Sequence, residues 1–262
     1  MNKKEFVITE ENVNKYVQNI AKWIKEQVEN ARAKGVVLGM SSGVDSSTVA
    51  RLCQEAHVDT HLIIMPYGDT MNKSKSYECA MELINKFNFK YHVFDIKPAV
   101  DCIQIAKNSE LINASNCSNI ELAYANIRPR IRMTYLYQYA GINNLLVIGT
   151  GNLSEATVGY FTKWGDGACD LNPLANLTKK EVYILAKYLQ VPDSIINKKP
   201  SAELWEGQTD EDELGITYEK IDKFILTRTT GEKIEDNLIK DKQEKAMHKH
   251  KPIPTFNEKG LI

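Results

Sequence analysis

Short, continuous apolar runs alternate along the chain with longer segments of helical periodicity. Four runs rich in branched residues are VVLGM (36–40), HLIIMP (61–66), YHVFDI (91–96) and LLVIGT (145–150). Because apolar residues follow one another without polar alternation, the runs predict parallel strands that are buried on both faces. Helical patterns predict the elements between them at about residues 45–57, 74–88, 98–107 and 118–140.

Further helices are predicted on both sides of this alternating region. Apolar positions from Val13 to Ala31 recur at helical spacing and indicate a long first helix that ends near Gly35. An amphipathic helix is expected after Thr178, and a charged helix over about 232–248 ends before the prolines of HKHKPIP. The acidic stretch SAELWEGQTDEDELG (201–215) is expected to form a loop.

Strands and helices that alternate in this way predict an α/β fold, with a doubly wound, mostly parallel sheet and helices on both faces. The sequence contains no internal repeat, low-complexity tract or linker, so residues 1–262 are predicted to form a single domain. Sheets of this kind bind ligands beyond the carboxyl ends of their strands, near a topological switch point. Functional residues are therefore expected directly after the strands.

Composition and charge exclude several classes of partner. The net charge of −1 argues against nucleic acid as the main ligand. No apolar stretch approaches the roughly 18 residues that span a bilayer, and the first residues lack the apolar core of a secretory signal. The five scattered cysteines form no CxxC pair and fit a reducing compartment. We therefore expect a cytoplasmic protein with no nucleic-acid or membrane partner.

The first predicted strand runs into a turn rich in glycine and serine, GMSSGVDSS (39–47). The Walker loop GxxxxGK[ST] is excluded because the chain contains no Gly-Lys dipeptide. The stretch GTGNLS (149–154) lacks the third glycine of the dinucleotide fingerprint. A pyrophosphate group is still expected at this turn, bound by backbone N–H groups at the helix start and by the hydroxyls of Ser41, Ser46 and Ser47.

Two acids follow predicted strands and are candidates for a metal site. Asp45 would repel a pyrophosphate unless a cation lay between them, and Mg²⁺ prefers one or two carboxylates together with phosphate oxygens. Glu155, five residues after Thr150, is the second candidate ligand. Each acid has a structural alternative: Asp45 caps the helix that starts at Ser46, and Glu155 is a first-turn acid favoured by the helix dipole.

Several segments resemble a known enzyme family. SSGVDSS (41–47) resembles the SGGxDS loop of the N-type ATP pyrophosphatases, which split ATP between its α- and β-phosphates and transfer AMP to an oxygen. Ser42 departs from the glycine usual there, which leaves the loop geometry open. More narrowly, GTGNLSEATVGYFTKWGDGACDLNPLANLTKKEV (149–182) resembles the NAD synthetases. Further matches are RPRIRM (128–133), KKPSAELWEGQTDEDELGITY (198–218) and HKHKP (248–252).

The chain is thus identified as a member of the ammonia-dependent NAD synthetases, with an adenine nucleotide alpha-hydrolase-like fold. This resemblance implies amidation of deamido-NAD by ammonia, with ATP as co-substrate, Mg²⁺ as cofactor and an adenylated carboxylate as intermediate. It also implies a homodimer. Free ammonia is expected as the donor because the stretch before residue 36 is too short for an amidase domain; a separate glutaminase subunit stays open. The alternatives are a tRNA-modifying ATP pyrophosphatase and a non-catalytic nucleotide-binding module.

The resemblance also implies roles for individual residues. The implied catalytic residues are Asp45, Glu155 and Lys179, of which the two acids bind the metal. The implied ATP-binding residues are Gly39, Met40, Ser41, Ser42, Gly43, Val44, Asp45, Ser46, Thr150, Lys179 and Ser201. The implied deamido-NAD-binding residues are Arg130, Lys163, Asp170, His248 and Lys249. Contacts from the loop at 67–77 are not carried over, because this chain lacks the acidic run common there.

Overall fold

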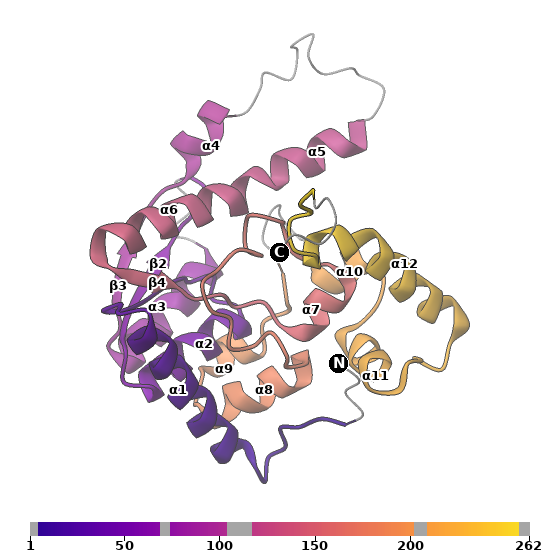
Figure 1. Ribbon diagram of the computed structural model, residues 1–262, viewed down its shortest axis with the longest axis horizontal. Coiled ribbons are helices and arrows are strands. Elements are labelled where there is room, and N and C mark those ends of the chain that lie inside the picture. Colours follow the sequence, from indigo (N-terminus) through magenta and orange to yellow (C-terminus); the bar gives the residue numbers. More distant parts are fainter. Residues whose placement is uncertain (1–4, 69–73, 104–116, 202–208, 257–262) are drawn as a thin grey trace.

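A four-stranded parallel sheet forms the centre of the molecule. The computed structural model describes residues 5–68, 74–103, 117–201 and 209–256 (Figure 1). The strands are β1 (Gly35–Gly39), β2 (Asp59–Ile64), β3 (Lys90–Val93) and β4 (Leu145–Val147). Their order in the sheet is β3-β2-β1-β4, and every neighbouring pair is parallel.

Helices cover both faces of this sheet. One face packs against α1 (Val13–Asn30), α2 (Val44–Glu55), α3 (Lys75–Phe87) and α8 (Lys179–Tyr188); the other packs against α4 (Lys97–Ile103) and α6 (Ile127–Asn143). Successive strand residues enter opposite cores: Leu38 and Leu62 lie in the first, and Val37 and Ile63 in the second. The predicted doubly wound α/β fold is confirmed.

The strand order creates a switch point between β1 and β4. The chain moves outward from β1 through β2 to β3 and then returns to pair β4 with the free side of β1. The connections after β1 and β4 therefore leave neighbouring strands at their carboxyl ends, which is where sheets of this kind bind ligands. The turn at 40–43 and the stretch at 148–152 lie at this point.

Five further helices lie beyond the carboxyl ends of the strands or beside them. They are α7 (Leu153–Val158), α9 (Asp193–Ile196), α10 (Asp210–Leu214), α11 (Tyr218–Thr227) and α12 (Lys233–His250). Figure 1 shows α11 and α12 farther from the sheet than α7 and α8. A separate apolar cluster that includes Val158, Leu214, Ile221 and Ile239 joins α7, α10, α11 and α12. The helix α9 instead packs on the main core through Ile195. That residues 1–262 form a single domain stays a prediction.

The prediction of one helix over 118–140 is wrong. Residues Cys117–Ala125 form α5, and α6 begins at Ile127 after the break at Asn126. Pro129 explains the break, because proline has no N–H to donate inside a helix but is tolerated in a first turn. The break places Pro129 in the first turn of α6.

The other differences concern the ends and exposure of elements. The first helix ends at Asn30 rather than near Gly35, because Gly35 belongs to β1, where an added Cβ would lie 2.1 Å from the Asp59 carbonyl oxygen. β3, one of the two edge strands of the sheet, is mostly exposed rather than buried. In the acidic stretch 201–215, α10 replaces the predicted loop over Asp210–Leu214, and residues 202–208 lie outside the described part.

Within the described ranges, no helix is long and apolar enough to cross a bilayer.

Candidate active site at the carboxyl ends of β1 and β4

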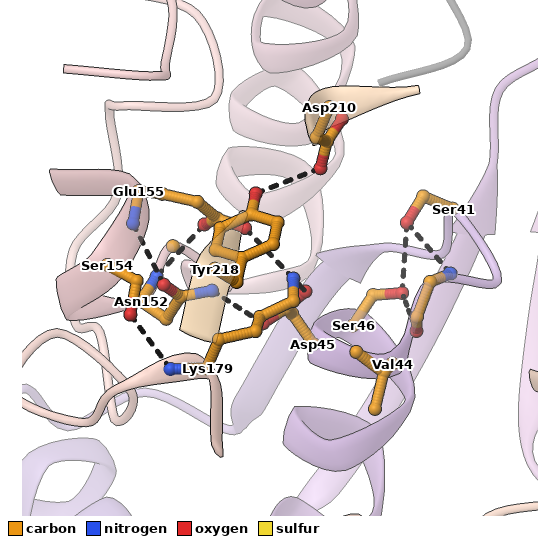
Figure 2. A network of polar contacts seen from close by, with 12 residues as sticks. Ser41, Val44, Asp45, Ser46, Asn152, Ser154, Glu155, Lys179, Asp210 and Tyr218 are labelled. Carbon is orange, nitrogen blue, oxygen red and sulfur yellow. Dashed lines mark hydrogen bonds and ion pairs between the residues drawn. The ribbon is translucent and has the colours of Figure 1, made fainter. Parts of the chain in front are cut away.

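Serine hydroxyls fix the turn that follows β1. The Ser41 and Ser46 hydroxyl oxygens lie 3.1 Å apart, Gly43 N–H donates to Ser41 Oγ at 3.3 Å, and Ser46 Oγ–H donates to the Gly43 carbonyl at 3.2 Å (Figure 2). Gly43 is the N-cap of α2, so the alternative that Asp45 caps this helix is wrong. The first N–H groups of α2 have no partner in the helix and can bind an anion.

Ser42 resolves the one departure from the SGGxDS pattern. Its backbone has a φ of 58°, in the left-handed region that glycine enters most easily. Its buried hydroxyl donates to the Ser41 carbonyl at 2.5 Å. The turn therefore keeps a glycine-like conformation although a serine occupies the position.

Asp45 and Glu155 converge on the ammonium group of Lys179. Lys179 Nζ donates to Asp45 Oδ2 at 2.6 Å and to Glu155 Oε1 at 3.2 Å (Figure 2). Asn152 Nδ2 donates to the other Asp45 oxygen at 2.8 Å. Three elements, α2, α7 and α8, thus bring three of the sequence-predicted residues together at the switch point.

Glu155 both caps α7 and contacts Lys179. Asn152 Oδ1 accepts from Glu155 N–H at 3.0 Å, while Asn152 N–H donates to Glu155 Oε2 at 3.1 Å. This capping box satisfies the start of α7 with one carboxylate oxygen. The second oxygen remains directed at Lys179, so the two interpretations of Glu155 are compatible.

A buried polar chain fixes the start of α8, where Lys179 stands. Lys179 N–H donates to Ser154 Oγ at 2.9 Å, and Ser154 Oγ–H donates to Asp222 Oδ1. Lys180 N–H donates to the other Asp222 oxygen at 2.9 Å. Ser154 and Asp222 are both buried, so α11 orients the first turn of α8 through contacts that exclude water.

The electrostatics of the cluster follow from burial and mutual charge. Lys179 is only 3% exposed. Burial lowers its pKa, but the carboxylates of Asp45 and Glu155 outweigh that effect and raise the pKa overall. Burial raises the pKa of Glu155 to about 7; Lys179 opposes this shift and Asp45 adds to it. The Tyr218 ring lies 4.7 Å from Lys179 Nζ and gives a further favourable cation–π contact.

A second cationic group lies around the turn at 159–163, near the end of α12. Lys249 Nζ donates to the carbonyls of Gly159 and Phe161, both at 2.7 Å. Lys163 Nζ donates to the His248 carbonyl at 2.9 Å, and Arg130 Nε donates to the Lys163 carbonyl at 3.3 Å. The structure thus brings together three of the five residues that the resemblance assigns to deamido-NAD.

The other two residues of that set are placed differently. Asp170 accepts from Val147 N–H at 2.7 Å and from the Tyr137 hydroxyl at 3.1 Å, which ties it to β4 and α6. The His248 side chain is exposed on α12. Asp166 accepts from Thr162 N–H at 3.0 Å and so stabilises the turn that follows Phe161.

The remaining predicted ATP-binding residues lie at or after the ends of β1 and β4 or belong to the segment after α9. Gly39 ends β1, Met40 N–H donates to the Ile63 carbonyl at 2.8 Å, and Val44 opens α2. Thr150 is half-buried in the stretch after β4. Ser201 is half-buried beside residues 202–208, which lie outside the described part, so its predicted contact with ATP stays a prediction.

Sequence reasoning missed several residues that shape this site. Asn152 had a usable signal, since Asn152 and Glu155 have the spacing of a capping box. Ser154, Tyr218 and Asp222 had no local signal, because their contacts join α7 and α8 to α11 across the chain. Their roles become visible only when these helices are packed together.

Comparison with known proteins gives a consistent result over nearly the whole chain. The NAD synthase family model matches residues 16–255. An NH(3)-dependent NAD(+) synthetase of Carboxydothermus hydrogenoformans is 44% identical over 238 residues, which cover 90% of this chain and 94% of that protein. The matches therefore cover most of this chain and most of the relative.

Two solved structures are also similar. NMN synthetase from Francisella tularensis has a TM-score of 0.85 and 37% identity, and the match covers 94% of this chain and 99% of that one. NH3-dependent NAD synthetase from Campylobacter jejuni has a TM-score of 0.73 and 32% identity over the same shares. These matches do not favour a tRNA-modifying enzyme or a non-catalytic module. The chain is a ligase and belongs to the NAD synthase family.

Proposed function

We propose that this chain amidates the nicotinate carboxylate of deamido-NAD with ammonia and consumes ATP in the reaction. The observation that carries the proposal is the convergence of Asp45, Glu155 and Lys179 at the switch point of a chain of the NAD synthase family. This is where a doubly wound sheet binds nucleotides.

The reaction requires activation because a carboxylate is a poor electrophile. A carboxylate oxygen attacks the α-phosphorus of ATP, the bond to the β-phosphate oxygen breaks, and pyrophosphate leaves. Ammonia then attacks the carbonyl carbon of the mixed anhydride, AMP leaves, and the nitrogen loses a proton to give the amide. No side-chain nucleophile is needed, so positioning and charge compensation account for the catalysis.

The phosphate side of the site uses the turn after β1. Backbone N–H groups at the start of α2 and the hydroxyls of Ser41 and Ser46 bind the phosphates of ATP. Lys179 compensates the charge that develops on the transferred group. Its position is supported by the Ser154–Asp222 chain, which fixes the start of α8.

Mg²⁺ is the proposed cofactor, and Asp45 and Glu155 are the residues that would hold it. Among the described residues, no group of three or more histidine, cysteine or acidic side chains could hold a metal. A pair of carboxylates fits Mg²⁺, which takes one or two from the protein and the remaining ligands from phosphate and water. When bound, the ion neutralises phosphate charge next to Asp45.

The cationic group at 159–163 is proposed to bind the dinucleotide. Arg130, Lys163 and Lys249 concentrate positive charge near α12, and Asp170 offers a carboxylate beside β4. His248 is proposed to contribute from the same end of α12. A homodimeric assembly and a cytoplasmic location stay predictions.

A second candidate substrate is nicotinate mononucleotide, the smaller analogue of deamido-NAD. The likeness to NMN synthetase from Francisella tularensis, with its TM-score of 0.85, favours testing it. The chemistry at the carboxylate would be the same. The two substrates differ in whether an adenylate half occupies the rest of the site.

One assay tests both proposals. The purified protein is incubated with ATP, MgCl₂, ammonium chloride and either acid substrate, and amide, AMP and pyrophosphate are quantified. Equal amounts of all three products, with none when the acid substrate is omitted, support an amidating ligase. The ratio of the two kcat/KM values identifies the preferred substrate. ADP as the nucleotide product, or turnover without ammonia, would contradict the proposal.

A further inference from the structure

The phosphate turn contains an acid but no lysine, and two lysines reach it from distant segments. Lys179 comes from α8 and contacts Asp45. Lys198 comes from the stretch after α9 and contacts Ser42, 156 residues earlier in the chain. Lys179 already has a family role. Lys198 has none in the site described above.

The backbone of Lys198 is well anchored. Its N–H donates to the carbonyl of Ile195 at 3.2 Å, which continues the turn of α9. Ile195 is 1% exposed and belongs to the main core of the sheet. Lys198 therefore projects from a firmly packed turn and reaches the phosphate turn with a half-buried side chain.

The Lys198 ammonium bridges two serines beside the turn. It donates to Ser76 Oγ at 2.7 Å and to Ser42 Oγ at 3.3 Å. Ser76 lies in the first turn of α3, and Ser42 lies immediately before the N-cap of α2. These two contacts hold the ammonium beside the turn that precedes α2.

We propose that Lys198 is a phosphate-binding residue that contacts the β- and γ-phosphates of ATP and the pyrophosphate product at the Ser42 end of the turn. This inference rests on the proposed function, since it assumes that the turn binds ATP. Charged phosphate oxygens are stronger acceptors than serine hydroxyls, so the ammonium moves from Ser42 to phosphate when nucleotide binds.

The two lysines reach the turn through different contacts. Lys179 contacts the carboxylates of Asp45 and Glu155, whereas Lys198 contacts the hydroxyls of Ser42 and Ser76. Lys198 therefore brings a second ammonium group to the turn, at its Ser42 end.

Ser42 helps to hold this lysine beside the turn. The hydroxyl donates to the Ser41 carbonyl, which leaves its lone pairs available to the Lys198 ammonium. A glycine at the same position would keep the left-handed backbone but offer no such acceptor. The departure of Ser42 from the SGGxDS pattern and the placement of Lys198 are therefore coupled.

The test compares Lys198→Met with the matched control Lys199→Met, which removes an exposed neighbour. For Lys198→Met we expect the KM for ATP and the inhibition constant for pyrophosphate each to rise about 10- to 100-fold, the range for one charge-assisted contact. The KM for the acid substrate should change less than about twofold. Lys199→Met should leave all three constants within about twofold. An unchanged KM for ATP in Lys198→Met, or an equal rise in both variants, overturns the inference.

A second pair of variants separates charge from packing. Lys198→Gln keeps a hydrogen-bond donor but carries no charge, whereas Lys198→Arg keeps the charge. Loss of affinity in the Gln variant with recovery in the Arg variant supports a phosphate contact; equal loss in both contradicts it. Calorimetric titration of pyrophosphate with Mg²⁺ needs no turnover. It therefore tests Lys198 even if the wild-type protein fails to form an amide, which would count against the proposed function alone.

Discussion

The lysine ammonium groups in the two charged regions of this molecule have different kinds of partner. At the switch point, Lys179 is buried and pairs with two carboxylates, Asp45 and Glu155. Near α12, Lys163 and Lys249 donate to backbone carbonyls instead. The first region balances charge with charge, whereas the second holds its cations with neutral dipoles.

Burial accounts for this difference. A fully desolvated ammonium requires an opposite charge, because leaving it unpaired costs several kcal/mol, about 3–5 when one partner is removed. The cations near α12 retain access to water, and carbonyl oxygens suffice to orient them. We therefore expect the first region to be rigid and intolerant of substitution, and the second to affect mainly the affinity for the dinucleotide.

The largest effect is expected from Asp45→Asn. Asparagine has the same shape but removes a charge that faces Lys179 and a proposed metal ligand. Amide formation should fall by about 10²–10³-fold or more, mainly in kcat. Initial rates of AMP release measure it, with thermal unfolding as the check that the protein folds. Turnover within tenfold of the wild type would refute the metal assignment.

A smaller effect, and one confined to substrate affinity, is expected from Lys163→Met and Lys249→Met. Each should raise the KM for the preferred acid substrate about tenfold, since one charge-assisted contact is lost, while the KM for ATP stays the same. Lys245→Met is the control, because Lys245 is exposed on α12 and pairs with Asp241 one turn away. A fall in kcat with unchanged KM would indicate that these lysines act in the chemical step rather than in binding the acid substrate.

Ser154→Ala tests whether the first region depends on its buried support. The substitution removes the link between Asp222 and the N–H of Lys179, so we expect kcat to fall about five- to tenfold and stability to fall by about 1–2 kcal/mol. Thr134→Ala deletes a hydroxyl that donates to the Arg130 carbonyl within α6 and serves as the control. If stability falls but kcat does not, Ser154 is structural and does not position Lys179.

In the ligand-free protein, stability rather than activity is expected to depend on pH through Glu155. The pKa of Glu155 is raised from 4.5 to about 7, so its ionisation opposes folding as the pH rises through that window. Glu155→Gln removes this contribution. The variant should therefore gain stability relative to the wild type between about pH 4.5 and 7, by roughly 1–3 kcal/mol. Chemical unfolding at several pH values measures the difference, and a constant difference across the window would disprove the shift.

The candidate site was predictable as far as its residues belong to local patterns. The turn after β1 and the segment from Thr150 to Glu155 follow apolar strands, and their types and spacing already indicated phosphate chemistry. Asp45 and Glu155 follow from these patterns, whereas Lys179 is implied by the resemblance to the NAD synthetases; the fold brings all three together. The break before α6 does not follow from the apolar pattern, because helical spacing continues past Pro129. The proline itself is the local signal for the break.

What the sequence determined by itself is the set of strands, their parallel arrangement and the chemistry offered at their ends, since burial period and turn residues are local properties. The tertiary structure decided which of those ends meet. Only the placement of β4 beside β1 brings Glu155 to Asp45, and only the packing of α9 and α11 brings Lys198 and Asp222 to the site. Such contacts depend on strand order and helix packing, which no local pattern encodes.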